Sequence, residues 1–284
     1  ATRGGDVVLW GGLCLSLVGV ATGDTAEENV AAIGSVMAAD TTLPATAAID
    51  GSDTTKVIPT CKWKGETGND IDLRVNFYDE ELPDGVGVTF TAMTGGTGNP
   101  DITEVFTSIG DEWYNWITMP YSDVANMVVL ETELDSRFGP LRAIGGRAFT
   151  AYKGTHSATG TYGSNRNGAH ITCMGTNNSP TPPYLWAAVN SVVGGTSLSI
   201  DPARQLKTLA LPGIKPPAKA DRWDGTERNQ LLFDGIATYT VDRAGVVRIE
   251  RQATMYQVNA SGFADDSYLN INTPETLERI RFDE

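Results

Sequence analysis

The pattern of apolar and polar positions is clearest over residues 221–256, near the C-terminal end of the chain. Asp224 and Glu227 have the spacing of a capping box at the start of a helix. Gly235 lies where a helix C-terminus favours a left-handed residue. This helix is expected to be followed by a strand, a turn and a second strand, at 236–241, 242–245 and 246–249.

A glycine-rich stretch over residues 94–100 divides the chain into two parts with different patterns. In the first part, short strands and turn-forming residues predominate. One helix is predicted at 24–39, where Asp24 and Glu27 have capping-box spacing and apolar residues follow at helical spacing. The strands predicted in this part are 7–20 (a pair joined by a glycine turn), 45–49, 57–64, 71–78 and 86–93.

In the second part, strands alternate with helices. A helix at 122–138 should end at Gly139 and Pro140. Its expected inner face consists of Val124, Met127, Val128, Leu134 and Phe138. The last helix is predicted to begin at Pro274, with Leu277 and Ile280 inside. Residues 155–162 are ambiguous. The remaining predicted helices are 101–110 and 182–198, and the remaining strands are 113–118, 147–152, 171–174 and 206–211.

These elements predict an α/β fold, with a mixed sheet flanked by helices and a smaller strand-rich α+β domain. The smaller domain is expected to occupy residues 1–98 and the larger one residues 99–284. The chain has 284 residues, which is enough for two domains of ordinary size.

The formal net charge is −14, and it is unevenly distributed. Residues 22–112 contain 17 acidic and 4 basic side chains, whereas residues 113–220 contain 5 acidic and 9 basic ones. Nucleic-acid binding without sequence preference needs clustered Lys and Arg, so we expect no direct nucleic-acid partner. The acidic part is expected to be a solvated outer surface.

Few residues offer catalytic chemistry. His156 and His170 are the only histidines, and with Cys173 and Asp201 they could form a nucleophile set. No local signature surrounds any of them, and the spacing of the two histidines matches no metal-ligand pattern. We therefore expect no enzymatic activity and no catalytic, cofactor-binding or metal-binding residues.

Other candidate motifs are also incomplete. The glycines at 95–98 lack the Lys-Ser/Thr of a phosphate loop, and the acidic turns at 70–72 and 79–81 lack the register of a calcium loop. Three widely spaced cysteines without a CxxC pair argue against a disulfide framework and favour a reducing compartment. The apolar run at 7–20 is shorter than the about 20 residues that span a bilayer, so no membrane insertion is expected.

Aromatic residues are dense between positions 113 and 121, where Trp113, Tyr114, Trp116 and Tyr121 surround Pro120. One interpretation is a carbohydrate- or surface-binding module. The other is a strand that enters the core, where aromatic rings supply much of the buried area.

Several strings in order along the chain resemble the contractile tail sheath proteins of Mu-like bacteriophages. The segment 221–256 is one of them. The others are 65–74, 93–101, 114–121, 137–141, 147–156, 173–176 and 267–270. Each string alone is weakly specific, but their ordered combination is characteristic of the family. The first 60 or so residues match only loosely.

The resemblance implies a structural protein that self-associates in hexameric rings, stacked as a helical sleeve around a tail tube. It implies contraction that drives the tube through the host envelope, with tail tube, baseplate and tail terminator proteins as partners. A sheath protein belongs to the virion tail and is assembled in the host bacterial cytoplasm, and a bacteriocin-like particle is the related alternative.

The resemblance also implies that residues 1–98 project outward, and that N- and C-terminal regions of the family are absent from this chain. In the family, N- and C-terminal arms add strands to a sheet of the neighbouring subunit. The two strands within 221–256 are the expected docking place, and without the arms their edge should be bare.

Overall fold

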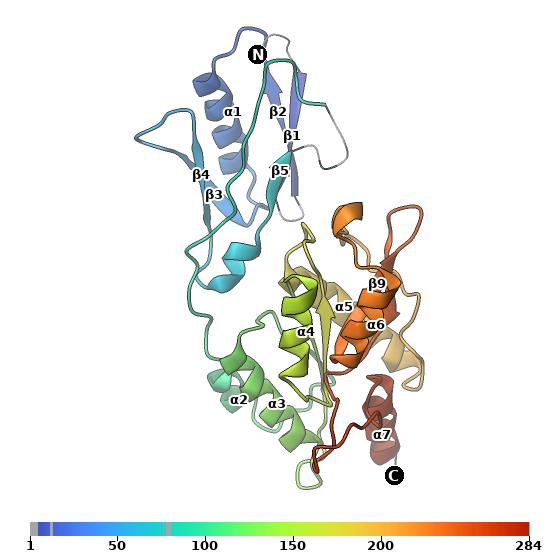
Figure 1. Cartoon of the computed structure of the whole chain (residues 1–284). Helices are drawn as coiled ribbons and strands as arrows, with labels where there is room; N and C mark the ends of the chain where they lie inside the picture. Colours follow the sequence, from blue (N-terminus) through green and yellow to red (C-terminus); the bar gives the residue numbers. More distant parts are fainter. Residues whose placement is uncertain (1–4, 12–13, 76, 78–80, 284) are drawn as a thin grey trace. The chain divides into compact units, whose positions relative to one another are not determined.

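The structure is a computed structural model that describes residues 5–11, 14–75, 77 and 81–283. Figure 1 shows the course of the chain through its helices and strands. Contacts within the chain separate two compact units, Ala1–Asn99 and Pro100–Glu284. Each unit has its own sheets and its own apolar clusters.

The first unit combines two antiparallel sheets with one helix. The longer sheet has the order β2-β1-β5, and the other is the β3-β4 hairpin. The helix α1 packs on β2 and β3, burying Met37 beside Leu9 and Leu43. The bounds are β1 Gly5–Gly11, β2 Cys14–Val20, α1 Ala26–Ala39, β3 Ala45–Ile49, β4 Val57–Cys61, a 3-10 turn η1 Glu66–Asp70, and β5 Leu73–Val75.

Some predictions for this unit are confirmed, and others need correction. The strand pair over 7–20 and the strand 45–49 are present, although the turn at 12–13 lies outside the described residues. The capping box of α1 is formed by Thr25 and Glu28, one residue later than predicted. No strand forms over 86–93, because no described strand lies beside that segment to complete its hydrogen bonds. The other strands are shorter than predicted, and residue 78 lies outside the described chain.

The second unit is built on a five-stranded sheet with the order β10-β9-β8-β7-β6. The strands β6 to β9 are parallel, and β10 is antiparallel to β9. The strands are β6 Trp116–Thr118, β7 Arg147–Tyr152, β8 Ile171–Gly175, β9 Ile236–Val241 and β10 Val247–Arg251. The helices are α2 Thr103–Ile109, α3 Val124–Phe138, α4 His156–Ser164, α5 Pro183–Ile200, α6 Gly225–Phe233 and α7 Asn272–Asp283, with a 3-10 turn η2 Lys219–Asp221.

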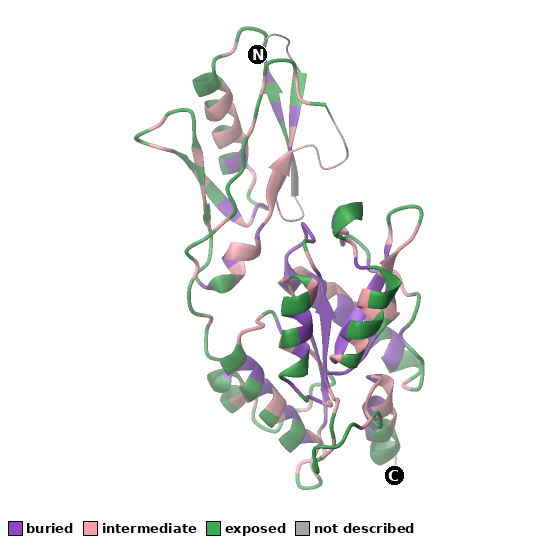
Figure 2. Cartoon of the chain, viewed as in Figure 1, coloured by how far each residue is buried: buried purple, intermediate pink, exposed green. Residues whose placement is uncertain are grey.

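Helices cover both faces of this sheet, as Figures 1 and 2 show. On one face, Ile171 and Cys173 of β8 pack with Leu130 of α3 and Leu231 of α6. On the other face, Met174 packs with residues of α5, among them Trp186. The predicted mixed α/β sheet flanked by helices, accompanied by small antiparallel sheets, is therefore confirmed.

The segment 221–256 folds as its pattern predicts. Asp224 caps α6, and its side chain and that of Glu227 form the reciprocal capping box. Gly235 follows the helix with φ +71°, a conformation that costs glycine little. The strands β9 and β10 then pair as a hairpin. The ambiguous stretch at 155–162 forms most of α4, with Thr155 as its N-cap.

Three predictions about buried faces and strands are wrong in whole or in part. In α3, Met127 and Leu134 are buried as predicted, together with Leu130, whereas Val124 and Val128 are exposed. The last helix begins at Asn272, and its inner face carries Glu275 and Glu278, with Leu277 and Ile280 exposed. Segment 206–211 does not form a continuous strand. It makes one isolated antiparallel bridge, between Ala210 and Arg248.

We predict that Gly163→Ala destabilises the second unit, although alanine is the better helix former. A Cβ at this position of α4 would lie 2.1 Å from the carbonyl oxygen of Asp234. Overpacking of this kind costs about 1–3 kcal/mol. The measurement is the free energy of unfolding in urea. Gly225→Ala in α6 is the control, because its Cβ would meet nothing within 4 Å. Equal stability of the two variants would contradict the prediction.

Candidate assembly site

The outer edge of β10 is already paired within the chain. Thr208 donates its backbone N–H to Ile249 at 2.7 Å, and Ile249 donates to Leu209 at 2.9 Å. Leu211 donates to Val247 at 2.9 Å. The expectation of a bare edge beside the strands of segment 221–256 is therefore wrong, because segment 208–211 supplies the missing hydrogen bonds.

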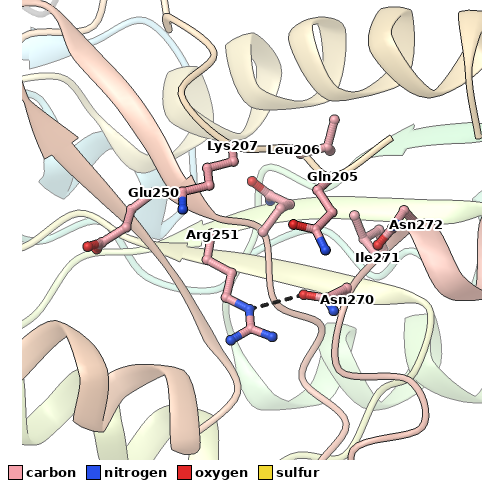
Figure 3. Close-up of a pocket in the computed structure, with 9 residues that line it drawn as sticks. Gln205, Leu206, Lys207, Glu250, Arg251, Asn270, Ile271 and Asn272 are labelled. Atoms are coloured by element: carbon pink, nitrogen blue, oxygen red, sulfur yellow. Dashed lines mark hydrogen bonds between the residues drawn. The ribbon is translucent and has the colours of Figure 1, made fainter. Parts of the chain in front are cut away.

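A second segment covers the chain that follows β10. Ile271 donates its backbone N–H to Gln252, Thr254 donates to Leu269, and Ala253 forms a bridge with Asn270. Between the two covered stretches lies a recess of about 270 Å³, seen in Figure 3. It is lined by Gln205, Leu206, Lys207, Glu250, Arg251, Gln252, Asn270, Ile271 and Asn272.

Several polar side chains around this recess bond to other residues of the same chain, although Gln252 Oε1 is buried without a hydrogen-bond partner. Arg251 Nε donates to Asn270 Oδ1 at 3.0 Å, as drawn in Figure 3. The carboxylate of Glu250 accepts from Arg228 at 2.7 Å and from Thr238 at 3.0 Å. Gln252 Nε2 donates to Thr172 Oγ1 at 2.8 Å. These contacts hold β10 against its neighbours and make the recess part of the fold.

The opposite edge of the sheet is β6. It pairs with β7 in parallel, with Trp116 beside Arg147 and Thr118 beside Phe149. Within the described chain, no segment pairs with the outer side of β6. An unpaired edge is a place where a strand from another molecule can add.

A cluster of charged side chains lies where β7 begins. Arg147 is fully buried. Its guanidinium donates to the carbonyls of Gly146 and Pro274, and its Nε lies 3.5 Å from Glu275 Oε2. It also lies over the ring of Phe138, 5.5 Å from the centroid. Burial lowers the pKa of Arg147 to about 10, so the side chain remains charged at neutral pH.

The same cluster holds α7 against the sheet. Glu278 Oε1 accepts the backbone N–H of Gly145 at 2.9 Å. Arg281 donates to the carbonyl of Phe138 at 2.7 Å and lies over the phenyl ring of that residue. The inner face of this helix is therefore polar. The sequence signal for this face is a pair of glutamates three residues apart, Glu275 and Glu278, which the apolar pattern of the helix obscures.

His170 belongs to this cluster and to no catalytic arrangement. Its Nδ1 lies 3.3 Å from an Arg147 nitrogen that can only donate, so Nδ1 accepts and the proton lies on Nε2. Nε2 lies 3.6 Å from Asp135 Oδ1. Burial and the charges of Arg147 and Arg281 lower the pKa of His170 to about 3. The ring is therefore neutral and structural.

The other members of the supposed nucleophile set are not assembled around His170. Cys173 is buried in the core beneath α3, and burial raises the pKa of its thiol to about 12. His156 starts α4 and contacts the carbonyl of Glu227 at 3.0 Å. Asp201 is exposed at the end of α5.

A metal-binding cluster and a membrane-spanning helix are also absent from the described part of the chain. Among the described residues, no group of three or more His, Cys, Asp or Glu could hold a metal ion. Of the helices in the described chain, none is long and apolar enough to cross a membrane. The acidic turn at 79–81 lies mostly outside the described residues.

The aromatic residues between positions 113 and 121 do not form one platform. Trp113 donates to the carbonyl of Gly145 at 2.7 Å and packs on the Phe282 ring. Trp116 packs on Phe149 and the cluster around Leu198. Tyr121 packs against the core cluster on the other face of the sheet, which contains Leu130 and Cys173. Tyr114 is exposed. The arrangement favours core packing over a sugar-binding surface.

Comparison with known proteins places these features in a family. Residues 95–255 match the model of the phage tail sheath protein central domain. The tail sheath protein of the Mu-like prophage FluMu from Haemophilus influenzae is 41% identical over 264 residues, which make up 93% of this chain and 53% of that protein. The chain therefore spans about half the length of this relative.

Two solved sheath tail proteins are also similar. The one from Desulfitobacterium hafniense has a TM-score of 0.47 and 11% identity, covering 99% of this chain and 63% of its own. The one from Listeria innocua has a TM-score of 0.47 and 14% identity, and the match covers 98% of this chain and 61% of the Listeria chain.

We predict that Arg147→Met destabilises the second unit by about 3–5 kcal/mol, because it leaves buried carboxylates without their cation. Arg142→Met is the control. Arg142 pairs with Asp111 and Glu133 near the surface, where the loss should stay below about 1 kcal/mol. Urea unfolding measures both. Adding Glu275→Gln to Arg147→Met should restore part of the loss, and equal effects of the two arginine variants would refute the role of the cluster.

We also predict an acid-sensitive contribution from His170. The unfolded ring binds a proton near pH 6.5, whereas the folded ring does so only near pH 3. The contribution of the neutral ring to the free energy of unfolding is therefore complete above pH 6.5. Below that pH it falls by up to about 1.4 kcal/mol per pH unit. His170→Gln should flatten the stability profile between pH 6.5 and 3. An unchanged slope in His170→Gln would disprove the assignment.

Proposed function

The chain belongs to the phage tail sheath family, and we propose that it is a structural subunit of a contractile tail. In this proposal, subunits form hexameric rings that stack as a helical sleeve around the tail tube. Contraction of the sleeve then drives the tube through the host envelope. The observation that carries the proposal is the 41% identity to a Mu-like prophage tail sheath protein over nearly the whole chain.

The physical properties of the second unit support a mechanical role. Contraction needs rigid bodies that change their contacts with one another while their interiors stay packed. Both faces of the sheet are buried under helices, and Arg147 ties α7 to the start of β7. The described residues offer no assembled nucleophile, so we propose that the protein is not an enzyme and that the energy of contraction is stored between two arrangements of subunits.

The partners follow from the same proposal. Neighbouring sheath subunits are the first partner, and a strand from an adjacent subunit would add at the outer edge of β6, since segment 208–211 occupies β10. Tail tube, baseplate and tail terminator proteins would complete the tail. The protein would be part of the virion and would assemble in the host bacterial cytoplasm.

We further propose that the acidic unit Ala1–Asn99 projects outward from the sleeve. Its excess of carboxylates makes a solvated surface more favourable than one buried between subunits. The larger unit, Pro100–Glu284, would then form the wall of the sleeve.

The experiment that tests assembly is electron microscopy of the product of the complete gene at high concentration. We expect hollow tubes or long cylinders of stacked rings. The variant Leu134→Asp serves as a control for folding-dependent assembly, because Leu134 is fully buried in α3. A folded parent protein that stays monomeric at all concentrations would overturn the proposal.

A second prediction concerns the position of the first unit. Replacing residues 5–94 by a short flexible linker should leave tubes that form normally but have a smaller outer diameter. Cryo-EM reconstruction of both tubes measures this. If the density lost from the shortened protein lines the lumen, the unit faces the tube and the outward position is wrong.

A further inference from the structure

The helix α5 (Pro183–Ile200) carries no charged residue over its 18 positions. Its inner side packs on the sheet through Trp186 and Ala187. Its outer side carries no charge and exposes two large apolar side chains, Val192 (68%) and Ile200 (78%), together with the small polar residues Thr196 and Ser199. A helix that faces only solvent normally carries charged and polar residues on that side.

A second apolar stripe lies on α2 and the start of α3. Val105 of α2 is 52% exposed, and Val124 and Val128 of α3 are 69% and 51% exposed. The two helices contact each other, so these three side chains belong to one layer. We call this the α2–α3 stripe, and the outer side of α5 the α5 stripe.

The two stripes lie on opposite sides of the same sheet. Successive side chains of a strand point to opposite faces. Cys173 of β8 packs under α3, and the next residue, Met174, packs under α5. A single subunit therefore cannot cover one stripe with the other, whereas two subunits stacked face to back can.

The charge around the stripes is complementary. Residues 101–135, which include α2 and most of α3, contain eight acidic and no basic side chains. Residues 182–220, which include α5 and the chain that follows it, contain one acidic and four basic side chains. That following chain stays on the α5 side, because Leu206 packs with Leu198 and Leu211 packs with Trp186.

Several of these charges have no opposite partner inside the subunit. Among the described residues, Asp101 and Glu104 form no ion pair, and neither do Arg204, Lys207 and Lys219. Some acidic residues of the first layer are already neutralised, since Glu131 pairs with Arg166 and Glu133 with Arg137. The unpaired charges belong to the segments that carry or adjoin the two stripes, and polar groups commonly surround the core of an interface.

We infer that the α5 stripe of one subunit packs against the α2–α3 stripe of a second copy of this chain. This inference rests on the proposed function for the identity of the partner. A contact between two different faces is heterologous, and repeated it produces a ring or a helical array. Contact of α5 with α5 would bring two basic layers together, and contact of α3 with α3 would bring two acidic layers together, which disfavours both symmetric pairings.

Cross-linking in assembled tubes tests the contact directly. The double variant Val128→Cys/Val192→Cys, in a Cys61→Ser background, is treated with a short bis-maleimide. We expect a ladder of dimers, trimers and higher multimers on a denaturing gel. Each single variant should give no product beyond that of the background protein, because a heterologous contact then contains only one introduced thiol.

The possible outcomes separate the inference from the function. Tubes without a ladder would overturn the contact and leave the proposed function standing. Dimers from either single variant would show a symmetric pairing and would also overturn it. If the thiol introduced by Val192→Cys does not react with maleimide before assembly, another part of the same polypeptide covers α5. That result would likewise overturn the inferred contact. Absence of tubes in the parent protein would instead overturn the proposed function itself.

A charge introduced into the α5 stripe tests the contact in a second way, through the protein concentration needed for tube formation. Val192→Asp should raise the concentration needed for tube formation by about tenfold or more, because an unpaired carboxylate would be buried in the contact. Leu141→Asp is the matched control, since Leu141 is 99% exposed and lies outside both stripes. Equal assembly of the two variants would argue against the contact. Circular dichroism and urea unfolding confirm that both variants are folded.

Discussion

The two central strands β7 and β8 have to be covered on both faces, and the rest of the second unit depends on this constraint. Every residue of β8 and nearly every residue of β7 is buried. A parallel sheet in this situation requires a helix layer on each side. Glycines let the layers approach closely, as where Gly194 and Gly195 of α5 lie against Phe149 and Trp116. The surfaces left for contact with other molecules are consequently the outer sides of helices and the β6 edge of the sheet, since segment 208–211 pairs with β10.

The same strand also places a charge in the interior, because β7 begins with Arg147. A buried ion cluster contributes little net stability compared with an apolar core, but breaking it is costly. Its main consequence here is geometric. The carbonyl of Pro274 and the carboxylates of α7 can satisfy Arg147 in only one place, which fixes where the last helix docks. The polar inner face then leaves Leu277 and Ile280 outside.

The sequence was most informative where local chemistry and burial agreed. The capping box of Asp224 and Glu227, the left-handed Gly235 and the run of β7 were all predictable, because short-range patterns determine them. The face of α3 and the polarity of α7 were not, because they depend on which distant residues reach the helix. Val124 and Val128 have the right spacing for a core, yet α3 turns toward the sheet through Met127, Leu130 and Leu134. The pairing of Thr208 with Ile249 joins residues about forty positions apart, which no local pattern reports.

That pairing changes how a subunit of this kind can associate. With β10 occupied by its own chain, main-chain hydrogen bonds to a neighbour are left to the short edge of β6. Three residues provide few such bonds, so strand addition alone would hold two bodies weakly and leave their relative angle free. In the contact inferred here, helix faces with matched charge would supply what the edge lacks, since they would fix orientation over a wider area. A sleeve of the proposed kind, which would exchange one arrangement of subunits for another, would need both kinds of contact. Strand pairing can keep subunits tethered throughout the change, while side-chain faces can separate and form again without unfolding either body.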